Sequence, residues 1–364
     1  LTQNSVAQAD AAGNIALTSS ESITTQGSVI AGKQLNVVGK SLSNSGQWSA
    51  EGIASIKGSS LSNSGVLQGK SLAIVAEQDV RVTGRLNAAD SLNINAKSVT
   101  TAASAQVQSG NDLTLTTETA SLSGTHAANN QFTVAANTLT HDGKSNARTV
   151  YLNAPDNIAN NGTLVADSLN LTSQRITNSG LMQGNAALNL HTGELTNLSG
   201  GSLYSIAALT LDIPSLTNRG LITTDGNLRL GGSSLVNAGE INGISMQNDY
   251  ATVTNDAAGR LLAENALSIS GQHLDNAGLL AANSMMLSSQ SVNNRGNMLS
   301  VGALNLTSQT FNNAGLLQGD TLTLQTNEWV NSGNALGESG VTATVHDLFS
   351  SQGKVLSQQK MVLA

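Results

Sequence analysis

The side chains that could carry out acid–base chemistry in this sequence are few and scattered. His141 and Asp142 are adjacent, but neighbouring residues on a strand point to opposite faces, and no nucleophile is evidently paired with them. Several carboxylates stand apart from one another: Asp79, Asp90, Asp112, Asp167, Asp212, Asp225 and Asp320. We interpret them as solvated surface acids, because a hydrolytic site would gather such groups in one place.

The sequence predicts no cofactor and no metal site. Cysteine is absent, which excludes thiol chemistry, and neither an HExxH motif nor a phosphate loop or dinucleotide fingerprint occurs in context. The 16 lysines and arginines are scattered singly against 23 acids, for a net charge of −7, so no basic stripe could bind nucleic acid. No apolar run is long enough to predict a membrane span.

One stretch of the chain gathers polar and aromatic groups that could recognise a partner. We take as candidate receptor contacts the residues His126, His141, Asp142, Arg148 and Tyr151. The stretch is irregular, and exposed irregularity is where repeat proteins commonly carry recognition. The alternative is a tolerated loop that binds nothing.

The composition indicates the class of fold that positions these residues. Aromatic residues are only 2% of the chain, so leucine, isoleucine, valine, alanine and methionine must fill the interior. The chain has 36 glycines and 2 prolines, which suits frequent turns and backbone N–H groups that stay available for ladders. This combination is typical of repetitive β-structure.

An internal repeat of roughly nineteen residues runs through the chain. The segment 61–68 (LSNSGVLQ) returns as 176–183 (ITNSGLMQ) and as 311–318 (FNNAGLLQ), and each copy is followed by an apolar-x-apolar triplet. Alternation of apolar and polar residues indicates strands, and no helical period is sustained. We therefore predict an all-β, right-handed parallel β-helix, a solenoid with roughly nineteen residues per coil and about 18 coils.

We expect residues 1–364 to form a single continuous β-helix whose two ends are cut from a longer chain. The two leucines of the repeat unit and both members of the triplet should point inward. The repeat's asparagine lies two residues after an inward leucine, so it should also face inward, in a ladder of stacked amides. This file comprises Asn44, Asn63, Asn160, Asn178, Asn197, Asn218, Asn237, Asn255, Asn276, Asn294 and Asn313.

A glycine follows two residues after the asparagine position. We expect it to form a corner that needs either a positive φ or a close approach of two backbones. The corner glycines are Gly46, Gly65, Gly84, Gly162, Gly220, Gly239, Gly278 and Gly296.

The repeat is interrupted in several places. Residues 99–157 are predicted to form irregular coils, in which Thr101, Gly124 and His141 take the asparagine position. The segments 198–202 and 256–260 each lengthen the corner and indicate wider turns. Near the C-terminus Ser332 and Ser350 are expected to replace asparagine.

The repeat unit L-x-N-x-G-x-L followed by L-x-L resembles the haemagglutinin repeats of the filamentous haemagglutinin and CdiA family. The resemblance runs from about residue 23 to residue 349, and a dozen or more repeats in phase make it specific at the family level. It implies a very large exoprotein of Gram-negative bacteria that an outer-membrane transporter of the two-partner type exports, and that is displayed extracellularly as a filament. The family's secretion domain and its C-terminal toxin have no counterpart in these residues.

Three hypotheses about function follow. In the first, the segment is a structural stalk of an adhesin or contact-dependent inhibition toxin, which projects an effector or binding tip toward other cells. In the second, it contains a receptor-binding patch for a target-cell surface. In the third, which the scattered acids disfavour, it is a polysaccharide-degrading β-helix enzyme. Unpaired ends of a cut solenoid could also join two copies into a dimer.

Overall fold

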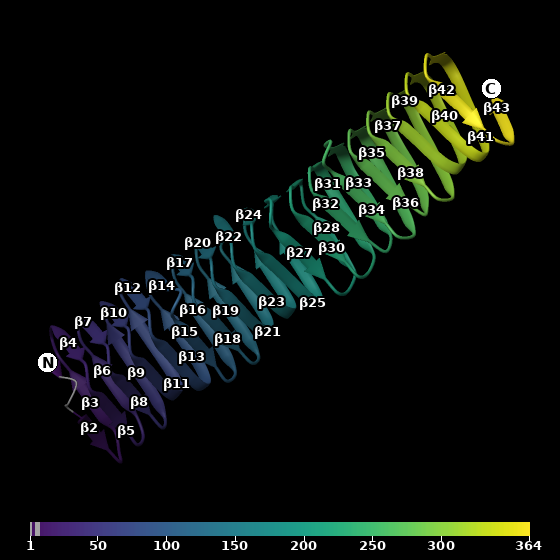
Figure 1. The fold of residues 1–364 in the computed structure, drawn as a ribbon. Helices are drawn as coiled ribbons and strands as arrows, with labels where there is room; N and C mark the ends of the chain where they lie inside the picture. Colours follow the sequence, from purple (N-terminus) through teal and green to yellow (C-terminus); the bar gives the residue numbers. More distant parts are fainter. Residues whose placement is uncertain (1, 4–7) are drawn as a thin grey trace. The chain divides into compact units, whose positions relative to one another are not determined.

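The computed structural model describes residues 2–3 and 8–364. The chain separates into two compact units, residues 1–185 and residues 186–364. The described residues of both units form β-strands joined by short turns and contain no helix (Figure 1). Each coil carries three short strand segments, one on each of three faces. In the coil that begins at Ser41 these are β7 (Ser41–Asn44) on what we call the asparagine face, β8 (Gln47–Ala50) on the second face and β9 (Ile53–Gly58) on the third face. In other coils one long strand continues from one face onto the next.

Unit 1 begins each coil on the asparagine face. The strands of this face are β1 (Thr2–Gln3), β4 (Ser22–Thr25), β7 (Ser41–Asn44), β10 (Ser60–Asn63), β12 (Asp79–Val82), β14 (Ser98–Thr101), β17 (Thr119–Leu122), β20 (Thr138–His141), β22 (Asn157–Asn160) and β24 (Arg175–Asn178). The second-face strands are β2 (Gln8–Ala11), β5 (Ser28–Ala31), β8 (Gln47–Ala50), β15 (Gln106–Ser109) and β18 (Thr125–Ala128). The third-face strands are β3 (Ile15–Thr18), β6 (Leu35–Val38), β9 (Ile53–Gly58), β16 (Asp112–Thr116) and β19 (Gln131–Ala135). Long strands that cover the second and third faces are β11 (Val66–Ala76), β13 (Arg85–Asn95), β21 (Lys144–Asn153) and β23 (Thr163–Thr172), and β25 (Leu181–His191) contains the boundary between the units.

Unit 2 repeats this order with longer strands. Its separate short strands are β26 (Glu194–Asn197), β27 (Ser202–Ser205), β28 (Leu209–Asp212), β29 (Ser215–Asn218), β30 (Leu221–Thr224), β32 (Glu240–Gly243), β34 (Arg260–Ala263), β36 (Leu279–Ala282), β38 (Asn297–Ser300), β42 (Lys354–Ser357) and β43 (Lys360–Leu363). Strands that run from the third face onto the next asparagine face are β31 (Leu228–Asn237), β33 (Met246–Asn255), β35 (Ala266–Asn276), β37 (Ser284–Asn294) and β39 (Ala303–Asn313). The longest strands are β40 (Leu316–Asn331) and β41 (Asn334–Ser351).

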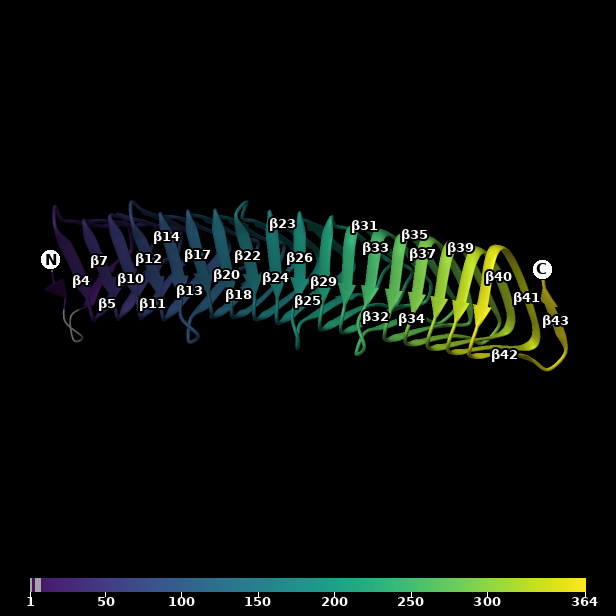
Figure 2. The ribbon, with the colours of Figure 1, turned by 90° about the horizontal axis from the view of Figure 1, so that it is seen from above.

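Within each unit, equivalent strands of successive coils pair in parallel and in register (Figure 2). In unit 1, Leu61 lies opposite Leu42 and Asn63 opposite Asn44. In unit 2, Leu216 lies opposite Leu195 of the preceding coil. Hydrogen-bonded asparagines of successive coils are 18, 19 or 21 residues apart. The prediction of an all-β parallel β-helix with about nineteen residues per coil is confirmed, and a single continuous body over residues 1–364 stays a prediction.

The apolar core of each unit lies inside the coils. The inward positions of one repeat, Leu61, Leu67, Leu72 and Ile74, are all buried. Because strand side chains alternate between faces and every coil repeats the pattern, these positions form columns of stacked aliphatic side chains. Each unit also buries one tryptophan, Trp48 in unit 1 and Trp329 in unit 2.

The wider turns predicted at 198–202 and 256–260 are confirmed. In each of them a backbone N–H returns to a carbonyl three residues earlier, Gly201 to Leu198 and Gly259 to Asp256. A third turn of this kind, Ala105 to Ala102, lies within the stretch predicted to be irregular. This turn shifts the register, so that Leu122 lies opposite Thr101 and His141 opposite Leu122. The expectation that Gly124 takes the asparagine position is therefore wrong.

The serines expected in the asparagine position near the C-terminus are also displaced. Asn331, not Ser332, lies opposite Asn313, and Ser351, not Ser350, lies opposite Asn331. The physical reason is a change of coil length, because Asn313 and Asn331 are hydrogen-bonded at a separation of 18 residues and Asn331 and Ser351 at a separation of 20.

The corner glycines are required by a close approach of two backbones. A Cβ atom built on any of the eight corner glycines would lie 2.0–2.2 Å from a carbonyl oxygen of the preceding coil. Positive φ does not explain them, because among described glycines only Gly200 and Gly232 have a φ in that region. Gly65, for example, packs directly against the carbonyl of Gly46.

Substituting Gly65 with alanine should destabilise unit 1 by about 1–3 kcal/mol, because the added methyl forces two coils apart. The measurement is urea unfolding followed by the fluorescence of buried Trp48. Gly13→Ala is the matched control, because no atom lies within 4 Å of the position of its new Cβ. Equal effects of the two substitutions would contradict the close-approach explanation.

Candidate functional site

The asparagine file of unit 2 is a continuous ladder of hydrogen-bonded amides. From Asn197 onward each side-chain Nδ2 donates to Oδ1 of the next asparagine at 2.8–2.9 Å. The members are Asn197, Asn218, Asn237, Asn255, Asn276, Asn294, Asn313 and Asn331. The second amide hydrogen reaches a backbone carbonyl, as from Asn237 Nδ2 to Arg260 O at 3.1 Å. All these side chains are buried and hydrogen-bonded, so the file satisfies its polar groups without water.

Unit 1 carries the same ladder in two separate parts. At the first part, Thr25 Oγ1 donates to Asn44 Oδ1 at 3.1 Å, and Asn44 Nδ2 donates to Asn63 Oδ1 at 2.8 Å. At the second, Asn160 Nδ2 donates to Asn178 Oδ1 at 2.8 Å. Between the two parts the asparagine position is taken by Val82, Thr101, Leu122 and His141.

A buried chain of polar side chains leads from the gap back into the ladder. Thr101 Oγ1 lies 2.9 Å from His126 Nε2, and His126 Nδ1 lies 3.3 Å from Ser145 Oγ. Ser145 Oγ lies 2.8 Å from His141 Nε2, and His141 Nδ1 lies 2.8 Å from Asn160 Oδ1. We call these five side chains the histidine chain. All five are buried.

The histidine chain uses two inward files of unit 1. Thr101, His141 and Asn160 belong to the asparagine file, whereas His126 and Ser145 lie in the second-face file that contains Val107 before them and Leu164 after them. Leu122 leaves a coil without a polar group in the asparagine file, and His126, on the second-face strand that follows in the same coil, hydrogen-bonds Thr101 and Ser145 in its place. The ring of His126 also stacks on Phe132, with centroids 5.9 Å apart.

The two rings of the histidine chain are held neutral. Burial lowers the pKa of His126 to about 3, with a smaller contribution from the charge of His141. Burial also lowers the pKa of His141, although its hydrogen bond to Asn160 and the nearby Asp142 carboxylate act in the opposite direction. A neutral imidazole has one donor and one acceptor nitrogen, which is what the chain requires at both positions.

The proposed receptor contacts are therefore divided between the interior and the surface. His126 and His141 are fully buried in the folded coil and cannot touch a partner, so the expectation that they are exposed is wrong. Asp142, Arg148 and Tyr151 are exposed. Asp142 precedes the second-face part of β21 and Arg148 follows it, so the structure does not gather the three into one patch. Sequence reasoning missed Ser145 as a partner of both rings, although its replacement of a repeat leucine was a usable signal.

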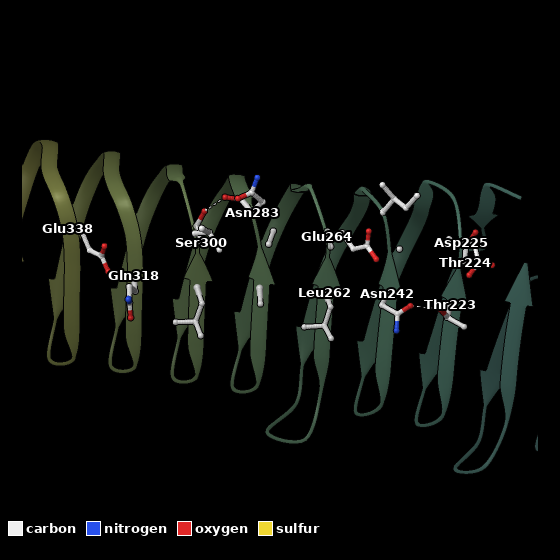
Figure 3. Close-up of a pocket in the computed structure, with 17 residues that line it drawn as sticks. Thr223, Thr224, Asp225, Asn242, Leu262, Glu264, Asn283, Ser300, Gln318 and Glu338 are labelled. Atoms are coloured by element: carbon white, nitrogen blue, oxygen red, sulfur yellow. Dashed lines mark hydrogen bonds between the residues drawn. The ribbon is translucent and has the colours of Figure 1, made fainter. Parts of the chain in front are cut away.

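Unit 2 has a groove on its outer surface that sequence reasoning did not predict. Its volume is about 1130 Å³, and it crosses successive coils along the second face (Figure 3). The floor is one outward row of the sheet: Thr223, Asn242, Leu262, Ala281, Leu299 and Gln318. The centre of this row is apolar and both ends are polar. Apolar residues at outward positions of the repeat were the signal that could have revealed it.

Carboxylates border one side of this groove. Asp225, Glu264 and Glu338 lie in a second row beside the floor (Figure 3). None of the described lining residues is a lysine or an arginine. The Asp225 carboxylate accepts a hydrogen bond of 2.6 Å from the hydroxyl of Tyr204. The groove is thus an apolar trough with a negative edge, which favours an elongated ligand with aliphatic and cationic groups.

The groups that would be needed for catalysis are not gathered at one place. Within the described part of the chain, no three His, Cys, Asp or Glu side chains lie close enough together to hold a metal ion. The His141 ring bonds Ser145 and Asn160, while the exposed Asp142 carboxylate accepts a hydrogen bond from Asn161. These observations give no positive support for catalysis in this segment. Over the described residues, no helix has the length and apolarity of a membrane span.

The solenoid, its repeat and sequence similarity together support a CdiA-like or filamentous haemagglutinin-like protein. The chain is 31% identical over 140 residues to the 16S rRNA endonuclease CdiA of Enterobacter cloacae subsp. cloacae, which covers 38% of this chain and 4% of that protein. It is 39% identical over 114 residues to Toxin CdiA of Escherichia coli, covering 31% and 3% of the two chains. It is 30% identical over 134 residues to the tRNA nuclease CdiA of Yersinia mollaretii, covering 36% and 4%.

These matches concern a small part of each relative. The chain aligns with only 3–4% of the length of the relatives named above. The nuclease activities in the names of the Enterobacter cloacae and Yersinia mollaretii proteins are those of these relatives. No family model and no solved structure matches the chain.

Replacing Asn237 with alanine should destabilise unit 2 by about 1–3 kcal/mol, because the amide hydrogen of Asn218 and the Oδ1 of Asn255 lose their partners in a dry interior. The measurement is denaturant unfolding followed by the fluorescence of Trp329. Asn305→Ala is the matched control, because Asn305 is the outward member of an L-x-L triplet and the loss should be within about 0.5 kcal/mol. A ladder variant as stable as this control would show that the amide file does not contribute to stability.

Proposed function

We propose that this chain is a structural spacer within a large surface-displayed exoprotein. The observation that carries the proposal is the in-register stacking of coils, in which buried leucine columns and asparagine ladders join each coil to the next. Stability of this kind is added coil by coil, so length can change without a change of fold. Such a segment suits the separation of a cell surface from a distal effector or binding tip.

The setting of this spacer is part of the proposal. The similarity to CdiA toxins supports export through an outer-membrane transporter of the two-partner type and display outside a Gram-negative bacterium. The nuclease activity that the relatives' names record would lie in another part of such a protein. We infer no enzymatic role for the coils themselves, because their acids and histidines serve surface solvation and internal hydrogen bonding.

The spacer function predicts that whole coils are dispensable. Deletion of residues 45–63 removes one repeat and joins Asn44 to Ser64, the residue that follows the next asparagine of the ladder. In the full-length exoprotein on its producing cell, this deletion should leave surface display and activity toward neighbouring cells unchanged. The readouts are antibody labelling of intact cells and a competition assay against target cells.

A half-coil deletion is the control for this experiment. Removal of residues 45–53 destroys the register, turns apolar side chains outward and should abolish display. Loss of activity by the one-coil deletion, with display intact, would contradict a pure spacer and would indicate that the deleted surface has a specific partner.

A second candidate function is recognition of a target-cell surface by the groove of unit 2. The groove supports this candidate because the centre of its floor is apolar and carboxylates line one edge. Its ligand would be an elongated molecule with aliphatic and positively charged groups. The exposed Arg148 and Tyr151 of unit 1 remain a separate, smaller candidate contact.

Binding of the purified chain to target cells separates the two candidates. The spacer predicts no saturable binding. The groove predicts saturable binding that Ala281→Arg abolishes, that the double change Glu264→Gln and Glu338→Gln weakens, and that salt reduces. Thr342→Arg is the control, because it places the same charge at an outward position of the third face. Binding lost only on Arg148→Ala or Tyr151→Ala would point to unit 1 instead.

A further inference from the structure

The geometry points to an acid-sensitive opening point inside unit 1. We infer that protonation of the histidine chain separates the coils between β14 and β22, whereas coils with asparagine and leucine in the same two files stay closed. This inference concerns conformational stability and does not rest on the proposed spacer function. It follows from the hydrogen-bond donors and acceptors of the histidine chain, which can all be assigned.

The hydrogen-bond donors can be assigned from the fixed ends of the chain. Asn160 Oδ1 can only accept, so His141 must carry its proton on Nδ1 and accept at Nε2 from the Ser145 hydroxyl. The Ser145 oxygen then accepts from Nδ1–H of His126, and His126 Nε2 accepts from the Thr101 hydroxyl. At the other end, the backbone N–H of Ser123 donates to Thr101 Oγ1 at 3.2 Å.

An added proton has no acceptor in this arrangement. A protonated histidine has two donors, and each ring already faces a hydroxyl that donates to it. A rotated hydroxyl can accept from the charged ring, because its oxygen has two lone pairs, but its own hydrogen then loses the ring nitrogen that accepted it. One donor would therefore lose its acceptor inside a dry interior, which is a costly arrangement.

The surroundings offer little compensation for a buried positive charge. From the packed elements, β14, β21 and β22 contribute only Thr101, Ser145 and Asn160 to the chain, and β19 contributes the apolar Phe132. The charged or titratable groups that influence the two rings are each other and the exposed Asp142 carboxylate, which acts on His141. The ring centroids are 6.4 Å apart, so two charged rings would also repel each other.

The sign of the effect follows from the two pKa values of each ring. An unfolded histidine takes up a proton as the pH falls through 6.5, but burial holds the folded pKa of His126 near 3 and also lowers that of His141. Between these limits the unfolded state binds more protons, so the folded state loses stability as the pH falls. The unfolding equilibrium constant should rise about tenfold per pH unit for His126 alone.

A variant that restores the repeat provides the comparison. The four changes Thr101→Val, His126→Leu, His141→Asn and Ser145→Leu place consensus side chains in both files, since Val82, Val107, Asn160 and Leu164 occupy equivalent positions in neighbouring coils. Asparagine at 141 can donate to Asn160 as the other rungs of the ladder do. His141→Asn alone is a second variant, because it removes one titratable ring and keeps a donor to Asn160.

The test is urea unfolding of the full chain between pH 7 and pH 4.5. With Trp329→Phe, fluorescence reports on unit 1 through Trp48, and with Trp48→Phe it reports on unit 2 through Trp329. Unit 1 of the native chain should lose stability more steeply with acid than unit 1 of the restored variant, by at least tenfold in the equilibrium constant per pH unit below 6.5. His141→Asn should remove part of this slope.

Hydrogen exchange locates the opening. After incubation at pH 5 or pH 7, a labelling pulse at one common pH should mark amides of residues 101–160 more strongly in the acid-incubated native chain, and not in the restored variant. Replacement of the exposed His191 and His273 with glutamine is the control and should change neither result. Equal acid sensitivity of the native and restored chains, or acid-induced labelling spread evenly over unit 1, would overturn the inference.

Discussion

Each coil of this protein must satisfy its polar groups and its apolar side chains with the coil before it and the coil after it. A single coil of three short strands has no other layer to pack against, so its strand backbone, the amides of the asparagine ladders and its inward leucines depend on the adjacent coils. The residue types of the repeat follow from this requirement. Leucine supplies a stackable apolar side chain, asparagine both donates and accepts along the axis, and glycine allows the corner backbones to touch.

The histidine chain shows that this requirement is chemical and does not depend on one residue type. Where Leu122 occupies the asparagine file, two neutral imidazoles and two hydroxyls transmit the same donor-to-acceptor sequence and return it to Asn160. The substitution keeps the interior satisfied but introduces titratable groups. The stability of this region therefore depends on pH. The amide ladder of unit 2 has no titratable group and introduces no such dependence.

Much of the fold could be predicted because the same sequence pattern recurs in many coils. Period-two alternation and the spacing of Asn63 to its equivalents determine strands, faces and coil length before any coordinates are known. The errors arose where coil length changes by one or two residues without a clear marker. The turn at 102–105 lacks the glycine that marks the turns at 198–202 and 256–260, so Gly124 was placed where Leu122 belongs.

Side-chain burial at irregular positions was harder to predict than the fold. The sequence around His126 favours an exposed polar residue. Its ring can be buried because Thr101 and Ser145 lie within hydrogen-bonding distance, and this proximity is not visible in the sequence. The groove of unit 2 could be predicted only in part. Its outward apolar residues are visible in the sequence, but the groove also depends on how an outward row and a corner row lie side by side, which no single repeat contains.

The amides of the asparagine file all point the same way, and this gives the fold a direction. In the ladder of unit 2, each Nδ2 from Asn197 to Asn313 donates to the Oδ1 of its C-terminal neighbour, so this ladder has an acceptor end and a donor end. Two such files can continue one another only head to tail, because like ends would bring donors against donors or acceptors against acceptors. End-to-end pairing of two amide ladders would therefore be heterologous, and repeated pairing of this kind produces open fibrils with a direction in place of closed symmetric pairs.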